Sequence, residues 1–293
     1  MAVPASSSSS SSGLFSAPTS IRTLFKSFPL AVHSAEALPA RASDDAADAA
    51  VLPRLYVFAR EHDAELGLPS YNPSCLKWQT ILRIASIDVR LVPSSNHASP
   101  SGALPFLIPP STASTSVPLT GEKIARFARQ RAPGANLDDP SPRIDAYQAL
   151  IAHGVRPAWL HSLYVNPTND ALLSTLYLPS SALLRPAQRH ALRTAATTEI
   201  LKVTRRVAGG VDAEQLLFAA EEAFAALAAL LGEAEWFLGG EAPGVLDAEI
   251  FSYTHLLVGG QLAWEDNELE QRLRKFDNLV LHAKRLYQRY WNN

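Results

Sequence analysis

The chain has 293 residues, which is long enough for two domains and a terminal tail. Hydrophobic residues make up 47% of the sequence and charged residues 18%, so a sizeable buried core can form. The formal net charge of −2 at pH 7 provides no global field that would attract nucleic acid, which excludes binding driven by overall charge.

The sequence contains one cysteine, Cys75, so no intrachain disulfide can form and a reducing compartment is the simpler interpretation. No run of 18 or more apolar residues occurs, and the nearest candidate, Leu216–Leu231, contains Glu221 and Glu222. We therefore predict no transmembrane helix, so that any work at a membrane would be peripheral or would depend on a partner.

The N-terminal fifty residues differ in composition from the rest. Residues 1–19 are rich in serine, alanine and proline and are expected to form a disordered tail, and residues 20–50 are expected to form an arm and a linker. A cleaved mitochondrial presequence is an alternative, because residues 1–34 hold no acid and carry Arg22 and Lys26. A retained arm is favoured by its apolar cluster, which consists of Ile21, Leu24, Phe25 and Phe28.

Residues 51–132 show an alternation of short apolar strands and helices. In chain order we expect a strand at Leu55–Phe58, a helix at Ser74–Ser86 with Ser74 as its N-cap, a strand at Asp88–Val92, a cis peptide at Leu104-Pro105, a strand at Phe106–Ile108 and a helix opening near Thr120. This order is typical of a thioredoxin-like domain of the glutathione-transferase type, with a mixed sheet.

Residues 143–293 show only helical patterns, after a proline-containing linker at Ala132–Pro142. The expected helices are Ile144–Ala152, Pro157–Tyr164, Asn169–Leu176, Pro186–Ala208, Asp212–Leu231, Leu246–Val258 and Glu268–Trp291. An all-helical domain after a thioredoxin-like domain is again the layout of a glutathione transferase, so the predicted fold class is α/β plus all-α.

A glutathione site on this fold needs three elements. The first is a hydroxyl or thiol at the start of the first helix, which Ser74 or Cys75 could supply. The second is backbone pairing beside the cis-proline, which Leu104-Pro105 could supply, and the third is a serine at a place that Gly121 occupies. Cys75 has no second cysteine with which to exchange, and a buried cysteine acting as a small hydrophobe is the favoured interpretation. We predict no catalytic, cofactor-binding or metal-binding residues, since the histidines also lack metal-ligand spacing.

A second motif, Trp236–Gly240 followed by Pro243–Asp247, is predicted to serve folding rather than catalysis. Asp247 would cap the start of a buried helix, with Gly244 at the place where related sequences carry Ser or Thr. The two basic helices, Pro186–Ala208 and Glu268–Trp291, are expected to present solvated faces, with an anionic membrane or an acidic partner as the alternative.

Three phrases carry a resemblance, namely Ser20–Leu30, Tyr71–Thr80 and Ser95–Leu107. Together they resemble the metaxin family, in particular the fungal metaxin-like peripheral subunit of the mitochondrial sorting and assembly machinery, over about residues 20–291. The resemblance implies a non-enzymatic protein on the cytosolic face of the mitochondrial outer membrane. It also implies binding to the β-barrel assembly subunit, to a second metaxin-like subunit and to β-barrel precursors, with no cofactor. Two alternatives stay open: a glutathione transferase or thiol reductase using Ser74 or Cys75, and a soluble scaffold in a cytosolic complex.

Overall fold

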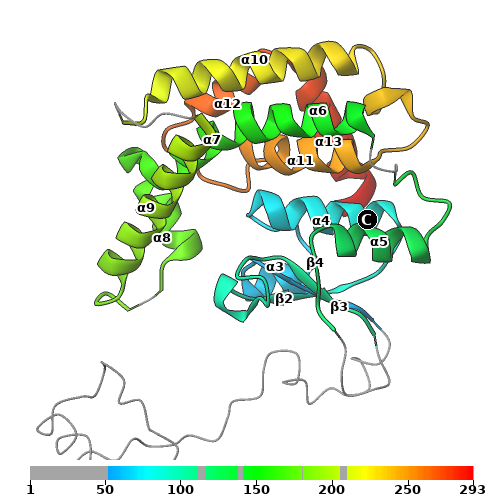
Figure 1. Ribbon diagram of the computed structural model, residues 1–293, viewed down its shortest axis with the longest axis horizontal. Helices are drawn as coiled ribbons and strands as arrows, with labels where there is room; N and C mark the ends of the chain where they lie inside the picture. Colours follow the sequence, from blue (N-terminus) through cyan, green and yellow to red (C-terminus); the bar gives the residue numbers. More distant parts are fainter. Residues whose placement is uncertain (1–51, 111–116, 138–140, 180, 205–209, 293) are drawn as a thin grey trace, which may run out of the picture. The chain divides into compact units, whose positions relative to one another are not determined.

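The computed structural model (Figure 1) describes residues 52–110, 117–137, 141–179, 181–204 and 210–292. The expected tail at 1–19 and the expected arm and linker at 20–50 lie outside these residues. Among the described helices, none combines the length and the apolar character that crossing a bilayer requires.

A four-stranded mixed sheet has the strand order β2-β1-β3-β4. Its strands are β1 (Arg54–Val57), β2 (Arg90–Pro93), β3 (Phe106–Ile108) and β4 (Leu119–Thr120). β1 runs parallel to β2 and antiparallel to β3, so that Leu55 lies opposite both Leu91 and Leu107. The peptide between Leu104 and Pro105 is cis, as the sequence predicts. β4 is an addition to the prediction, because a strand of two half-buried residues carries no alternating pattern.

In the described residues, three α-helices accompany the sheet: α3 (Glu61–Glu65), α4 (Pro73–Ile84) and α5 (Glu122–Arg131). The prediction that Ser74 caps α4 is wrong, because the cap is Asn72, whose side chain accepts a hydrogen bond from the Cys75 amide. Asn72 has extended backbone geometry and Pro73 takes the first helical position, where a missing N–H costs nothing. Between the sheet and these helices lies one apolar core, in which the rings of Tyr56 and Phe106 stack with centroids 4.3 Å apart.

The helical part begins with a continuous run of α6 (Pro142–Leu150), a π-helical turn η2 (Ile151–Val155), α7 (Arg156–Leu160) and a second π-helical turn η3 (His161–Val165). The sequence leaves open whether the helix continues or restarts after Gly154. It continues, because the π-helical turn η2 leads directly into α7, with Pro157 in the first turn of that helix. Gly154 also allows close packing, since a Cβ there would lie 2.7 Å from the Cβ of Ala223.

The remaining elements are η4 (Pro167–Asn169), α8 (Asp170–Tyr177), α9 (Arg185–Thr204), α10 (Ala213–Leu231), η5 (Phe237–Gly239), α11 (Val245–Val258), α12 (Glu268–Leu273) and α13 (Asp277–Trp291). The single helix expected at Glu268–Trp291 is therefore two helices. α12 ends as the Phe276 amide bonds the Leu273 carbonyl, and α13 begins with Asp277 in its first turn, where a negative charge is favourable.

The sheet side and the helical part meet through α4 and α11, which pack against each other (Figure 1). α11 is buried on nearly every side, with α6, α12 and α13 as its other helical neighbours. Lys77 on α4 and Glu249 on α11 form an ion pair of 3.0 Å across this contact, and Arg83 donates to the carbonyls of Gly67 and Tyr290. The boundaries at 51–132 and 143–293 stay predictions, since α4 contributes Leu76 to the helical core and α11 contributes Ala248 to the sheet core.

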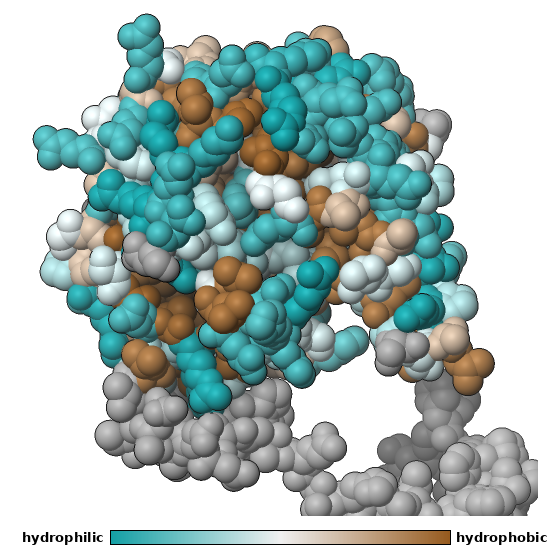
Figure 2. Space-filling view, turned by 180° about the vertical axis from the view of Figure 1, so that it is seen from behind, coloured by the Kyte–Doolittle hydropathy of each residue, from teal (hydrophilic) through white to brown (hydrophobic). Residues whose placement is uncertain are grey.

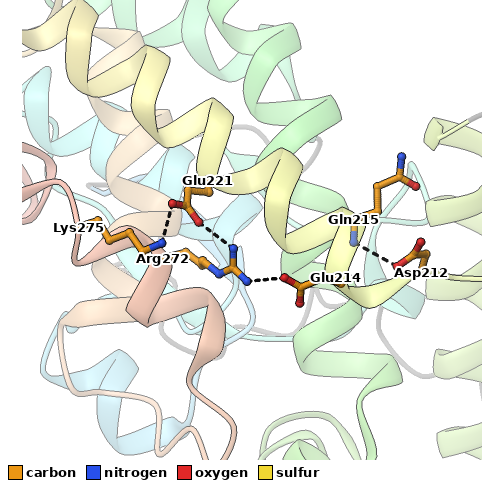
Figure 3. Close-up of polar contacts among 6 residues, drawn as sticks. All are labelled: Asp212, Glu214, Gln215, Glu221, Arg272 and Lys275. Atoms are coloured by element: carbon orange, nitrogen blue, oxygen red, sulfur yellow. Dashed lines mark hydrogen bonds and ion pairs between the residues drawn. The ribbon is translucent and has the colours of Figure 1, made fainter.

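Much of the positive charge of the last helices is paired within the chain. Figure 3 shows Arg272 between Glu221 and Glu214, at 2.8 and 2.7 Å, and Lys275 at 2.6 Å from Glu221. The hydrogen bonds from Lys275 and Arg272 hold the pKa of Glu221 below its usual value. These pairs join α10 to the segment around α12. They leave little unbalanced positive charge there for an acidic partner.

Candidate functional site

The start of α4 is the place where a thiol-binding protein of this fold would hold its ligand. Helix N-termini attract anions because their first N–H groups lack partners within the helix. Here the Asn72 side chain supplies that partner, accepting from the Cys75 amide at 3.2 Å. The amide nitrogen of the same Asn72 donates to the Tyr177 hydroxyl at 3.0 Å, which ties the cap to the helical part.

Cys75 is fully buried in the core between the sheet and its helices. The backbone N–H of Phe58 donates to its sulfur at 3.5 Å. Burial raises the pKa of the Cys75 thiol to about 12, so the thiol stays protonated at neutral pH. The structure thus favours the small buried hydrophobe over the reactive thiol.

Ser74, the other candidate for thiol activation, is exposed at the second position of α4. It lies two residues after the capping residue Asn72, so its side chain is exposed to solvent and does not cap the helix. An exposed hydroxyl at a helix start can hold an anion only when the nearby amides are available. The Cys75 amide is already used by Asn72.

The loop that precedes β3 satisfies the backbone beside the cis-proline with its own side chains. Asn96 lies in the short 3-10 helix η1 (Asn96–Ala98), and its Oδ1 accepts from the Leu104 amide at 2.9 Å. The hydroxyl of Ser99 donates to the Ala103 carbonyl at 2.6 Å. An extended ligand normally pairs with the backbone at this place, and the Leu104 amide is not free to do so.

Gly121 is the N-cap of α5, one residue after Thr120, at which we expected the helix to open, and its φ of +52° favours glycine. A Cβ added there would meet nothing within 4 Å. The position therefore has room for a side chain, but none is present to receive a charged ligand group.

A cluster of aromatic rings, which we call the tyrosine cluster, joins the end of β1 and the start of α4 to the helices α8 and η3. It consists of Phe58, Tyr71, Tyr164 and Tyr177, with successive ring centroids 5.2–6.3 Å apart. The Tyr71 hydroxyl donates to the Leu176 carbonyl at 2.9 Å. Burial is the main reason why the pKa values of Tyr71 and Tyr164 are raised to about 12, so these phenols stay neutral.

Asp247, the second predicted motif residue, is 2% exposed at the third position of α11. Its carboxylate accepts from the amides of Gly244 and Phe237, at 2.8 and 3.0 Å. It also lies 2.7 Å from Nε2 of the fully buried His282 on α13, and this nitrogen must carry the proton because a carboxylate can only accept. Within the described ranges, no three His, Cys, Asp or Glu residues are placed to hold a metal ion.

Comparisons with known proteins address the family. The family model described as Glutathione S-transferase N-terminal domain matches residues 73–169, and the one described as Glutathione S-transferase, C-terminal domain matches residues 220–286. The metaxin-1 homolog of Caenorhabditis briggsae is 25% identical over 224 residues, which cover 74% of this chain and 68% of that protein. Metaxin-2 of Mus musculus is 24% identical over 235 residues, which cover 77% of this chain and 85% of that protein. The chain is a metaxin-like protein with the glutathione S-transferase fold.

A solved structure supports the fold of this metaxin-like chain. The glutathione transferase GSTFuA2 of Phanerochaete chrysosporium aligns with a TM-score of 0.55 and 16% identity, over 82% of this chain and 98% of that one. At this level of identity the likeness concerns the fold alone. The predicted fold class, a thioredoxin-like domain followed by helices, is confirmed.

Sequence reasoning missed several polar residues that shape this site in the metaxin-like chain. The sequence did contain a signal for Asn72 as N-cap, because Asn before Pro is a strong helix-start pattern, but Ser74 is also a residue type that is common at N-caps. Asn96, Tyr177 and His282 had none, because their partners lie far away in the sequence or in an irregular loop.

Proposed function

We propose that this metaxin-like chain is a non-enzymatic subunit of the sorting and assembly machinery of the mitochondrial outer membrane. In this role it helps recognise and insert β-barrel precursor proteins. Its partners are the outer-membrane β-barrel assembly subunit, a second metaxin-like subunit and the incoming precursor. It lies peripherally on the cytosolic face and uses no cofactor. Its similarity to metaxins over about three quarters of its length supports this role.

One observation carries the non-enzymatic part of the proposal: two backbone donors of the would-be glutathione site are satisfied internally. Asn72 bonds the Cys75 amide and Asn96 bonds the Leu104 amide. A ligand would have to break these bonds before forming its own, and exchanging one hydrogen bond for another yields little net free energy. Gly121 adds no side chain to compensate.

The runner-up is a glutathione transferase or thiol reductase that acts through Ser74 or Cys75. The exposed hydroxyl of Ser74 is the observation in its favour. Cys75 opposes it, because nucleophilic attack requires an accessible thiolate and this thiol is buried with a raised pKa. A soluble scaffold in a cytosolic complex is the other alternative, and fractionation of cells distinguishes it.

The proposal is tested by purifying the tagged full chain from a mild-detergent extract of mitochondria. We expect the β-barrel assembly subunit and a second metaxin-like subunit to co-purify, and the tagged chain to leave the membrane on alkaline extraction. A glutathione column serves as the comparison and should not retain the protein. Recovery of the chain in the cytosol without the barrel subunit would contradict the proposal, and retention by glutathione with turnover lost in Ser74→Ala would support the enzyme.

A further inference from the structure

Two leucines, Leu183 and Leu184, are exposed at the turn between α8 and α9, and we call them the apolar tip. The exposed fraction of Leu183 is 91% and that of Leu184 is 54%. In Figure 1 α8 and α9 extend away from the other helices at the left, and Figure 2 shows this extension at the right, with apolar side chains at its lower end. Among the residues that the structure describes, no neighbour covers this apolar pair.

The first half of α9 is attached to the rest of the chain by polar bonds rather than by apolar packing. Its buried residues, Ala196 and Ile200, both lie in its second half. Asp170 on α8 forms ion pairs of 2.9 and 3.0 Å with Arg189 and Arg193. Because α8 is held in this way, the α8–α9 turn keeps a defined position while its apolar side chains point to solvent.

Positive charge follows the apolar tip along the first half of α9. Residues 181–198 contain no aspartate or glutamate. The same stretch carries Arg185, Arg189 and Arg193, which we call the basic collar. Asp170 offers one negative charge to two of these arginines, and the Arg185 guanidinium bonds a backbone carbonyl, that of Pro179, rather than a carboxylate. The collar therefore keeps a surplus of positive charge next to the leucines.

We propose that the apolar tip inserts into the headgroup region of an anionic lipid bilayer, with the basic collar at the level of the lipid phosphates. A projecting apolar pair followed by arginines on the adjoining helix matches the interface of such a bilayer, because acyl chains accept the leucines while phosphates pair with arginine. A protein partner is less well matched, since protein interfaces bury their apolar anchors in pockets and this tip projects outward.

Another exposed apolar side chain provides a contrast on the same molecule. Phe218 on α10 has an exposed fraction of 55%, close to that of Leu184. Its neighbours at helical spacing are Glu214, Glu221 and Glu222. Arg272 and Lys275 pair with Glu214 and Glu221, so no surplus of positive charge lies beside Phe218, whereas the basic collar has one. Equal exposure therefore predicts much weaker attraction to an anionic bilayer at Phe218.

The inference rests on the proposed placement at a membrane, and its test uses vesicles that contain no protein. The full chain is mixed with vesicles of phosphatidylcholine containing about one quarter phosphatidylserine, and bound protein is separated by flotation. We expect Leu183→Ser combined with Leu184→Ser to lower the partition coefficient by about tenfold or more. The matched variant Phe218→Ser should bind as the unaltered chain does, and Arg185→Gln should weaken binding by a few-fold in a salt-dependent way.

Insertion is read out separately with a fluorophore that responds to polarity, attached to Leu183→Cys. The buried Cys75 leaves this new thiol as the accessible one. A blue shift on adding vesicles is expected. Unchanged binding of the leucine double variant, absence of a blue shift, or self-association that the leucine variant abolishes would each overturn the inference. Vesicle binding without co-purification of the barrel subunit would contradict only the proposed function, and the reverse would contradict only this inference.

Discussion

Replacing Asp247 by alanine is expected to lower the free energy of unfolding by about 4 kcal/mol, because several buried hydrogen-bond donors lose their acceptor at once. The carboxylate accepts from the amides of Gly244 and Phe237 and pairs with Nε2 of His282. Each stranded donor costs about 1–3 kcal/mol, since no water reaches it. The measurement is urea denaturation at neutral pH, followed by circular dichroism.

A matched control is available at a more accessible helix start. Ser141 caps α6 and accepts only from the Ile144 amide, at 3.3 Å. Ser141→Ala should cost about 1 kcal/mol, the ordinary effect of losing an N-cap. Asp247→Asn should fall between the two variants, because an amide keeps one acceptor oxygen. A loss for Asp247→Ala no larger than that for Ser141→Ala would contradict the assignment of Asp247 as a buried junction.

Acidification from about pH 7.5 to about pH 5 is expected to remove about 2 kcal/mol of stability through His255 alone. This side chain lies between the rings of Phe251 and Tyr287, with centroids at 4.8 and 4.9 Å. Burial lowers the pKa of His255 to about 4, and the nearby Gln261 side chain opposes this shift only in part. The unfolded chain therefore takes up the proton first, so stability is complete above about pH 6.5 and declines as the pH falls toward 4.

The test compares the unaltered chain with His255→Phe at both pH values by urea denaturation. Phenylalanine keeps an aromatic ring in the stack and cannot be protonated, so the variant should lose about 2 kcal/mol less on acidification. His190→Phe is the control, because His190 is exposed on α9. Equal pH dependence for the unaltered chain and the His255→Phe variant would show that His255 is not held neutral by burial.

The predictions that held depend on patterns that a few neighbouring residues complete. β3 follows from an apolar run after a Leu-Pro pair, and the cis peptide before Pro105 follows from the same place in the fold. α10 spans Ala213–Leu231, because Asp212 caps its start and Gly232 terminates it, and both signals are local. The capping role of Asp247 could likewise be predicted from a local signal, its position three residues after Gly244.

The predictions that failed depend on contacts between distant segments. The break between α12 and α13 follows from how Phe276 packs and bonds, which no proline or glycine marks. His282 could not be assigned to Asp247, because 35 residues separate them. The candidate site divides in the same way. The lone Cys75 and the missing side chain at Gly121 are visible in the sequence, whereas the hydrogen bond from the Asn72 amide nitrogen to the Tyr177 hydroxyl, which holds the capping residue in place, is not.

The proposed role is measured most directly by assembly of a labelled β-barrel precursor in isolated mitochondria depleted of this chain. We expect the assembled, protease-protected barrel to decrease while a matrix-targeted precursor is imported normally. Adding back the unaltered chain should restore assembly, and a Ser74→Ala, Cys75→Ala double variant should restore it equally well. Normal barrel assembly without the chain, or failure of the folded double variant to restore it, would contradict a non-enzymatic role in β-barrel assembly.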